Sequence, residues 1–193
     1  MKSISSTVST TAYLSADGLH RYSLEKVWDE KKPRLLVLML VAGTSDSLCV
    51  DASTCHVMEN AVRLGFGSVT ICNLFSCIGD FLLRNEDSKY YAENEKVILA
   101  AAQEANTVVY CPGRGKAALK VFQARERELL TALKEVSMLS ISDGVSSTQY
   151  HPLSPKVKEW TLVPFNKEGS KEGEAEAAPP VTPSRKKGRK KTS

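Results

Sequence analysis

The sequence lacks the features that mark membrane and secreted proteins. No apolar run in its 193 residues approaches the roughly 18 residues that a membrane span requires. Residues 1–11 are rich in Ser and Thr and hold no apolar stretch of the length that a secretory signal needs. These absences predict an intracellular chain, cytoplasmic or associated with the nucleoid, with no membrane partner.

Paired cysteines are also missing. The chain has five cysteines, an odd number, and none of them forms a C-x-x-C pair. This usage is typical of free thiols in a reducing compartment. Cys55 and His56 are neighbours in a predicted helix, which would point them in different directions, and a zinc site needs closely spaced pairs of ligands. We therefore predict no structural metal and no cofactor.

Two motifs of nucleotide-binding and hydrolytic enzymes are absent. No GxxxxGK[ST] sequence occurs, which excludes a P-loop, and residues 43–47 do not form a GxSxG nucleophile elbow. A related feature is present between a predicted strand and a predicted helix, at Gly113, Arg114, Gly115 and Lys116. Exposed amides, a helix dipole and two cations suit a phosphate there, although a simple turn into a helix is the alternative.

The positive net charge of +4 is unevenly distributed. Residues 1–165 carry 18 Lys/Arg and 18 Asp/Glu, residues 166–178 carry an excess of two acids, and residues 179–193 carry six Lys/Arg with no acid. The basic character therefore belongs to the C-terminal tail. A folded domain that binds DNA usually carries a patch of basic side chains on its own surface.

Apolar runs alternate with helical patterns along the middle of the chain. The continuously apolar segment at residues 35–41 is typical of a parallel strand that is covered on both faces, and we predict further strands at residues 68–75, 107–111 and 136–141. Helices are predicted between them, from Asp51 or Ser53 to Leu64, over 92–105, and from about 116 to 134. The turn at Asp17-Gly18 predicts an N-terminal β-hairpin over residues 13–24.

This order of elements predicts an α/β fold, with a short parallel four-stranded sheet, helices on both faces and the hairpin in front of it. We assign residues 1–11 to a disordered N-terminus and residues 12–165 to the α/β domain. Residues 166–193 are too poor in apolar side chains to order themselves, and form an acidic and polar linker followed by a basic arm over 185–191.

Ligands of such sheets bind at the carboxyl ends of the strands. Asn73 ends the second predicted strand, and its amide can both donate to and accept from the edge of a base. His151 lies in a loop bounded by prolines, where an imidazole could donate to an oxyanion or act as acid or base. The alternatives are a turn-forming Asn and an exposed loop His.

An ordered set of short motifs gives a resemblance. The segments are Arg21-Tyr22-Ser23-Leu24, Trp28-Asp29, Gly65-Phe66-Gly67, Asn73-Leu74-Phe75 and His151-Pro152-Leu153. This order resembles domain of unknown function 1643, an uncharacterised family of bacteria and their phages. That family in turn looks like a distant relative of the uracil-DNA glycosylases, which place their pocket at the strand ends.

The resemblance implies roles for three places in the chain. Asn73, with Phe75 beside it, would bind the edge of a flipped base, and His151 would stabilise negative charge on the departing base. Cys111-Pro112-Gly113 falls where the family usually has Trp-Gly. At the end of the first strand, glycosylases place an Asp or Asn that positions water, and this chain has Val41-Ala42-Gly43-Thr44 instead. Asp46 follows two residues later, so the loop residues Gly43, Thr44 and Asp46 form a degenerate motif.

We therefore expect a base-processing or base-binding domain with a glycosylase-like pocket, and a DNA glycosylase-like hydrolysis as its possible activity. The partner is nucleic acid, most readily DNA, through the pocket and the tail. The tail cations are those that bind phosphates without sequence preference: Arg185, Lys186, Lys187, Arg189, Lys190 and Lys191. One alternative is a non-catalytic nucleotide- or DNA-binding module on the same fold. Another is a phage-related domain that recognises a protein partner, with a tail that tethers it to DNA. For the tail itself, the alternative is a targeting or solubilising segment.

Overall fold

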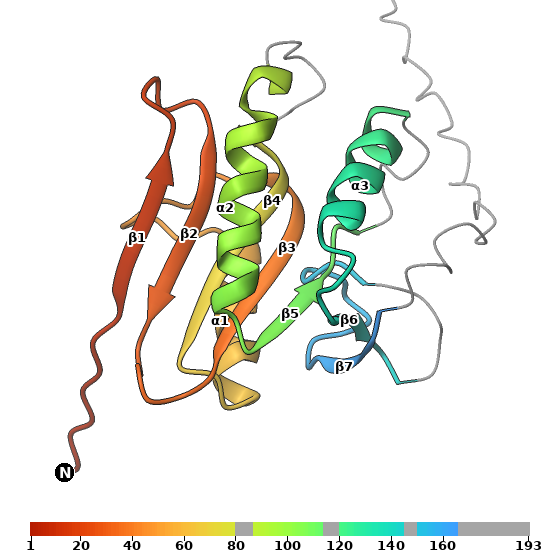
Figure 1. The fold of residues 1–193 in the computed structure, drawn as a ribbon. Coiled ribbons are helices and arrows are strands. Elements are labelled where there is room, and N and C mark those ends of the chain that lie inside the picture. Colours follow the sequence, from red (N-terminus) through yellow and green to blue (C-terminus); the bar gives the residue numbers. More distant parts are fainter. Residues whose placement is uncertain (80–86, 114–119, 145–149, 166–193) are drawn as a thin grey trace, which may run out of the picture.

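The chain forms one sheet with helices on both of its faces. The computed structural model describes residues 1–79, 87–113, 120–144 and 150–165. The seven strands of the sheet have the order β1-β2-β4-β3-β5-β6-β7. Helices α2 and α3 cover the near face in Figure 1, and α1 lies behind the sheet.

The four predicted strands form the centre of this sheet. They are β3 (Arg34–Ala42), β4 (Ser68–Ile78), β5 (Thr107–Tyr110) and β6 (Met138–Ser142), and they pair in parallel in the order β4-β3-β5-β6. The prediction of a four-stranded parallel sheet is wrong for the sheet as a whole, which is mixed. Three further strands pair antiparallel at its two sides, because the outermost parallel strands would otherwise leave their backbone groups unpaired.

The predicted hairpin is confirmed and is part of the sheet. Its strands are β1 (Ser9–Leu14) and β2 (Arg21–Val27), and β1 begins three residues before the predicted start of the domain. The amide of Gly18 donates to the carbonyl of Ser15, and Gly18 has φ +69°, as the Asp-Gly turn requires. Strand β2 then pairs with β4, so the hairpin extends the sheet on one side.

Each face of the sheet has its own apolar core. Helices α2 (Tyr91–Glu104) and α3 (Lys120–Ala132) cover a cluster that includes Leu36, Leu38 and Tyr110. Helix α1 (Ala52–Arg63) covers a second cluster, which includes Val37, Met39 and Ile71. These side chains alternate along β3, as expected of a strand that is buried on both faces.

The C-terminal part of the domain closes the sheet at its other side. Strand β7 (Thr161–Pro164) pairs antiparallel with β6, and no strand was predicted there because the segment is short and bounded by Pro164. Before it, Asn60 of α1 donates to the carbonyl of Lys158 and accepts from the amide of Trp160. The buried ring of Trp160 thereby lies on the α1 side of the sheet.

Candidate functional site

The carboxyl ends of the parallel strands bring the predicted site residues to one edge of the sheet. Asn73 was predicted at the end of a strand, but β4 continues to Ile78, so Asn73 lies in the middle of β4, where it pairs with Met39 of β3. The loop of residues 43–50 follows β3 in the middle of the sheet. Gly113 follows β5, the next strand. This edge, together with the N-terminus of α1, is the candidate site.

Asn73 is fully buried on the α1 side. It pairs in register with Met39, which belongs to the core under α1. Its Nδ2 donates to the carbonyl oxygen of Val41 over 2.8 Å, and its Oδ1 accepts from Nη2 of Arg21 over 3.4 Å. These two partners fix the orientation of the amide, since a guanidinium can only donate and a carbonyl can only accept.

Arg21 is the main residue of the site that sequence reasoning missed. It begins β2, yet only 1% of its surface is exposed, because its side chain crosses to the edge of the parallel strands. Besides Asn73, its Nη1 donates to the carbonyl oxygen of Ser45. Its Nε has no hydrogen-bond partner among the described residues. Burial lowers the pKa of Arg21, and the Asp51 carboxylate is the strongest opposing influence.

Asp51 is a second polar residue that the structure places at this edge of the sheet. The sequence predicted it only as one of two possible caps for α1, and it is the N-cap: its Oδ1 accepts from the amide of Thr54 over 2.8 Å. Its other carboxylate oxygen lies against Gly43, so closely that a Cβ at Gly43 would collide with it. A carboxylate from α1 therefore lies over the end of β3, where the strand itself carries no Asp or Asn.

Hydrogen bonds hold this carboxylate in its charged form. Burial alone would raise the pKa of Asp51, but hydrogen bonds from Thr54 and Ser45 outweigh it and lower the pKa overall. The amide of Asp51 donates to Oγ of Ser45 over 2.7 Å, and that hydroxyl donates to Thr54 over 2.9 Å. Arg21, Ser45 and Asp51 therefore join the start of β2 to the start of α1 through one polar network.

The predicted loop residues after β3 are more exposed. Thr44 and Asp46 are both exposed, and Gly43 is half-buried. The carboxylate of Asp46 accepts from the amides of Cys49 and Leu48, which lower its pKa, over 2.6 and 2.7 Å. This tight turn presents Leu48 with 90% of its surface exposed.

His151 lies directly on Gly113. A Cβ at Gly113 would be 3.1 Å from Cβ of His151 and 3.4 Å from its ring carbon Cδ2, and Gly113 has φ +76°. Burial lowers the pKa of His151. Its Nδ1 lies 3.1 Å from the amide nitrogen of Leu153, which donates to it. In the neutral ring the hydrogen is therefore on Nε2, which has no partner among the described residues and can donate to a ligand.

Phe75 is not brought to this edge. Its ring is fully buried in the core under α2 and α3, where it meets the ring of Tyr91 edge-on with 6.1 Å between centroids. Asn73 and Phe75 thus face opposite sides of the sheet. The remaining predicted contacts, Arg114, Gly115, Lys116 and the basic tail over 185–191, lie outside the described residues.

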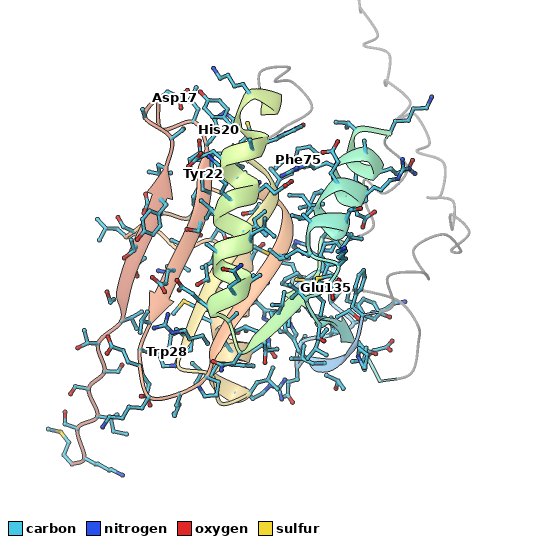
Figure 2. The ribbon with its side chains drawn as sticks, in the orientation of Figure 1. Asp17, His20, Tyr22, Trp28, Phe75 and Glu135 are labelled. Atoms are coloured by element: carbon cyan, nitrogen blue, oxygen red, sulfur yellow. The ribbon has the colours of Figure 1, made fainter. Side chains whose placement is uncertain are left out.

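A separate polar cluster joins the hairpin tip to the start of α2. Figure 2 shows Asp17 and His20 at this tip. Tyr90 donates to a carboxylate oxygen of Asp17 over 2.7 Å and stacks on the ring of His20 with 3.7 Å between centroids. Nδ1 of His20 lies 3.0 Å from Oγ of Ser76. Since Asp17 and Ser76 come from β-strand ends far apart in sequence, this cluster fixes the hairpin against β4.

The described part of the chain contains no set of three His, Cys, Asp or Glu side chains that could hold a metal ion. Cys72 within β4 and Cys111 after β5 are both buried, and burial raises the pKa of Cys72 to about 12. These thiols are therefore protonated and unreactive. No helix among the described residues has the length and apolarity needed to cross a membrane.

Comparison with known proteins gives one match. No curated protein and no solved structure matches the chain, so the likeness to glycosylases stays a prediction. Residues 21–153, more than half of the chain, match a family described as "Protein of unknown function (DUF1643)". The match begins at Arg21 and ends at Leu153, and so contains the whole candidate site. The chain belongs to this family, as its ordered motifs predicted.

Proposed function

We propose that this domain binds a nucleobase at the carboxyl edge of its parallel strands and cleaves the bond between that base and its sugar. The observation that carries the proposal is the contact of His151 with Gly113. It fixes an imidazole with a free Nε2–H at the ligand edge of the sheet. Such a donor stabilises negative charge that develops on a leaving base.

The Asp51 carboxylate supports the hydrolytic step. In this step a water oxygen attacks the anomeric carbon of the sugar, the glycosidic bond breaks, and its electron pair leaves with the base. Asp51 takes the proton of the water, and Nε2–H of His151 donates to the base oxygen that becomes negative. The low pKa of Asp51 keeps it charged at neutral pH, so it orients and polarises water. A base within a duplex must first be flipped out of the stack.

The test uses full-length protein and DNAs that contain uracil, damaged bases or modified bases. Abasic sites are revealed by alkaline cleavage, with Asp51→Asn, His151→Ala and Asn73→Ala as variants. We expect release of one kind of base by the wild type and at least a hundredfold slower release by Asp51→Asn and His151→Ala. Wild-type protein that releases no base from any DNA of the panel would contradict the catalytic part of the proposal.

A second function, base binding without catalysis, is favoured by the closure of the site. Asn73 and Arg21 are 0% and 1% exposed, so the inner end of the site is sealed by its own side chains. A binding module needs no positioned water, and β3 carries none of the usual residues at its end. Salt-dependent retention of one DNA in a gel shift, without base release, would favour this second function.

A further inference from the structure

Strand β1 is the outermost strand on the hairpin side of the sheet, and among the described residues it pairs only with β2. Figure 1 shows no described helix beside its outer edge. The opposite edge strand, β7, is four residues long and ends in Pro164, which has no amide hydrogen to offer. Proteins commonly protect sheet edges with short strands, prolines or charged side chains, and β7 has two of these features.

Strand β1 has none of these protections. It is six residues long, and residues 3–16 around it contain no charged side chain and no proline. The register of the hairpin skips Tyr22, so the β-bulge lies in β2 and β1 itself stays continuous. The ammonium group of Lys26 reaches β1, but it donates to the hydroxyl of Thr10 over 3.0 Å and Lys26 is buried. An uncharged and continuous strand edge is a ready template for a further strand.

The hydrogen bonds of β2 show which residues of β1 present their backbone outwards. The amide of Trp28, which directly follows β2, donates to the carbonyl that precedes β4. Backbone groups alternate along a strand, so the even-numbered residues of β2 point to β4 and the odd-numbered ones, such as Glu25, point to β1. Thr11 pairs with Glu25 and therefore points its backbone groups towards β2. Its neighbours Thr10 and Ala12 point theirs outwards.

A second copy of the chain fits these outward groups. When two β1 strands pair antiparallel around Thr11, Thr10 of each copy meets Ala12 of the other, and these residues exchange backbone hydrogen bonds. The same register brings Val8 opposite Leu14, and both of these side chains are exposed in the single chain. A register centred on Ala12 would leave Val8 beyond the paired strands.

We propose that two copies of this chain pair through their β1 strands, antiparallel and centred on Thr11, to form one continuous sheet. The twofold axis is perpendicular to this sheet, so the carboxyl ends of the parallel strands point in opposite directions in the two copies. Charge does not oppose the contact. The backbones of the two Glu25 residues lie three strand spacings, about 14 Å, apart, which exceeds the screening length of about 8 Å at physiological ionic strength. This inference does not depend on the proposed function.

Sedimentation of the full-length protein over a range of concentrations tests the dimer. A ladder of about seven residues per chain is a small interface, so we expect a reversible dimer that forms at roughly 10–100 µM. Protein that stays monomeric up to about 500 µM overturns the inference, because even a weak specific interface would be populated there.

Charge at position 11 tests the register. Thr11 is exposed in the single chain, so a charged side chain there leaves the fold in place, which circular dichroism checks. Thr11→Lys and Thr11→Glu each set like charges opposite each other on the twofold axis, and each is expected to weaken dimerisation at least about fivefold. A mixture of the two variants is expected to regain the dimer, because opposite charges then face each other.

Gln103→Lys is the control for the added charge, since it lies on the exposed side of α2 and is expected to dimerise like the wild type. Undiminished dimerisation of Thr11→Lys overturns the pairing through β1. A mixture of the two charged variants that does not regain the dimer overturns the register centred on Thr11.

A disulfide across the twofold axis tests the same contact directly. Cys49 and Cys55 are exposed, so both are first replaced by Ser. Thr11→Cys then sets two thiols opposite each other in a pair without hydrogen bonds, whose Cα atoms lie about 4.5 Å apart, within reach of a disulfide. Ser9→Cys is the control, because its two copies lie four residues, roughly 14 Å, apart along the strands. We expect oxidation to cross-link Thr11→Cys alone, and equal cross-linking of both variants overturns the proposed pairing.

Discussion

One glycine determines where the imidazole of His151 lies. Gly113 combines a left-handed backbone, φ +76°, with a tight contact, because a Cβ there would lie only 3.1 Å from Cβ of His151. Gly144 has nearly the same backbone angle, φ +77°, but nothing lies within 4 Å of the place that its Cβ would take. A comparison of substitutions at Gly113 and Gly144 therefore separates the cost of the left-handed backbone from the cost of the contact with His151.

Alanine at each glycine tests this contact. Gly144→Ala is expected to lower the free energy of unfolding by roughly 1–2 kcal/mol, the cost of a left-handed non-glycine residue. Gly113→Ala also displaces His151. It is therefore expected to lower the free energy of unfolding by more than Gly144→Ala does, and to shift the imidazole resonances of His151 in an NMR spectrum. Equal stability losses with an unchanged His151 spectrum in Gly113→Ala would contradict the contact.

The burial of His151 predicts a dependence of stability on pH. Its pKa is lowered from the ordinary 6.5, so the unfolded chain takes up the proton at a higher pH than the folded chain. The free energy of unfolding therefore falls as the pH drops below 6.5 and levels off below the folded pKa. Urea unfolding at about pH 7.5 and about pH 5.5 measures this loss, which His151→Asn is expected to reduce.

At the scale of elements, the helices are attached to the sheet by polar side chains as well as by apolar packing. Two helices reach β4 at the point where its ladder with β3 becomes irregular, after Val41 pairs with Phe75. Asn94 of α2 donates to the carbonyl oxygens of Asn73 and Leu74 over 2.9 and 3.3 Å. These two carbonyl oxygens of β4 therefore accept hydrogen bonds from a helix side chain.

Arg125 connects three elements in the same region. Its Nε donates to the carbonyl of Leu74 over 3.3 Å, its Nη1 lies 3.1 Å from Glu95, and its guanidinium stacks 4.8 Å from the ring centre of Tyr91. Arg125→Met is expected to cost about 1–3 kcal/mol, since it removes the buried hydrogen bonds of the guanidinium to the carbonyls of Leu74 and Tyr91. Exposed Arg127→Met is the control and is expected to change little in urea unfolding. Equal effects of both variants would show that Arg125 does not join α2, α3 and β4.

Helix α1 carries a residue with two separable roles. As its N-cap, Asp51 accepts from the amide of Thr54, and its charge lies at the end of β3. Asp51→Asn keeps an acceptor for the cap, whereas Asp51→Ala removes it at a cost of about 1 kcal/mol. We expect both variants to lose base release and only Asp51→Ala to lose about that much stability in urea unfolding. Normal base release by Asp51→Asn would exclude the carboxylate from the chemistry.

At the scale of the whole molecule, the balanced charge of residues 1–165 contrasts with the six cations of residues 179–193. Each phosphate that these cations neutralise adds about −0.7 to −0.9 to the slope of log affinity against log salt. A chain that ends at Phe165 is therefore expected to bind DNA with a much flatter salt slope. Its preference among nucleosides is expected to be unchanged, because the site lies within residues 21–153.

A fluorescence titration of full-length and shortened chains at several salt concentrations measures both quantities. Phe165 is 8% exposed and its amide donates to the carbonyl of Met138, so the cut follows the last residue that the structure describes and keeps its contact with the sheet. An equal salt slope for both chains would place the phosphate contacts on the domain. A changed nucleoside preference would show that the tail contributes to the base site.

The amino-acid sequence by itself determined the centre of the fold. The continuous apolar run at residues 35–41 has few other stable places than a covered parallel sheet, and the Asp17-Gly18 turn specifies a hairpin locally. The strand ends therefore predicted the edge at which the Gly113 turn lies, whereas β4 runs past Asn73 to Ile78. These features are local, and they depend on residue types that are neighbours in the chain.

Only the tertiary structure decided which side chains meet at that edge. Arg21 reaches Asn73 across 52 positions of sequence, and Asp51 reaches the end of β3 because α1 packs back against the sheet. Strand β7 and the pairing of the predicted hairpin with β4 were missed for the same reason, since pairing partners such as Glu25 and Thr70 are far apart in the chain. A local pattern carries no information on such contacts, because they form only when the whole sheet closes around its two cores.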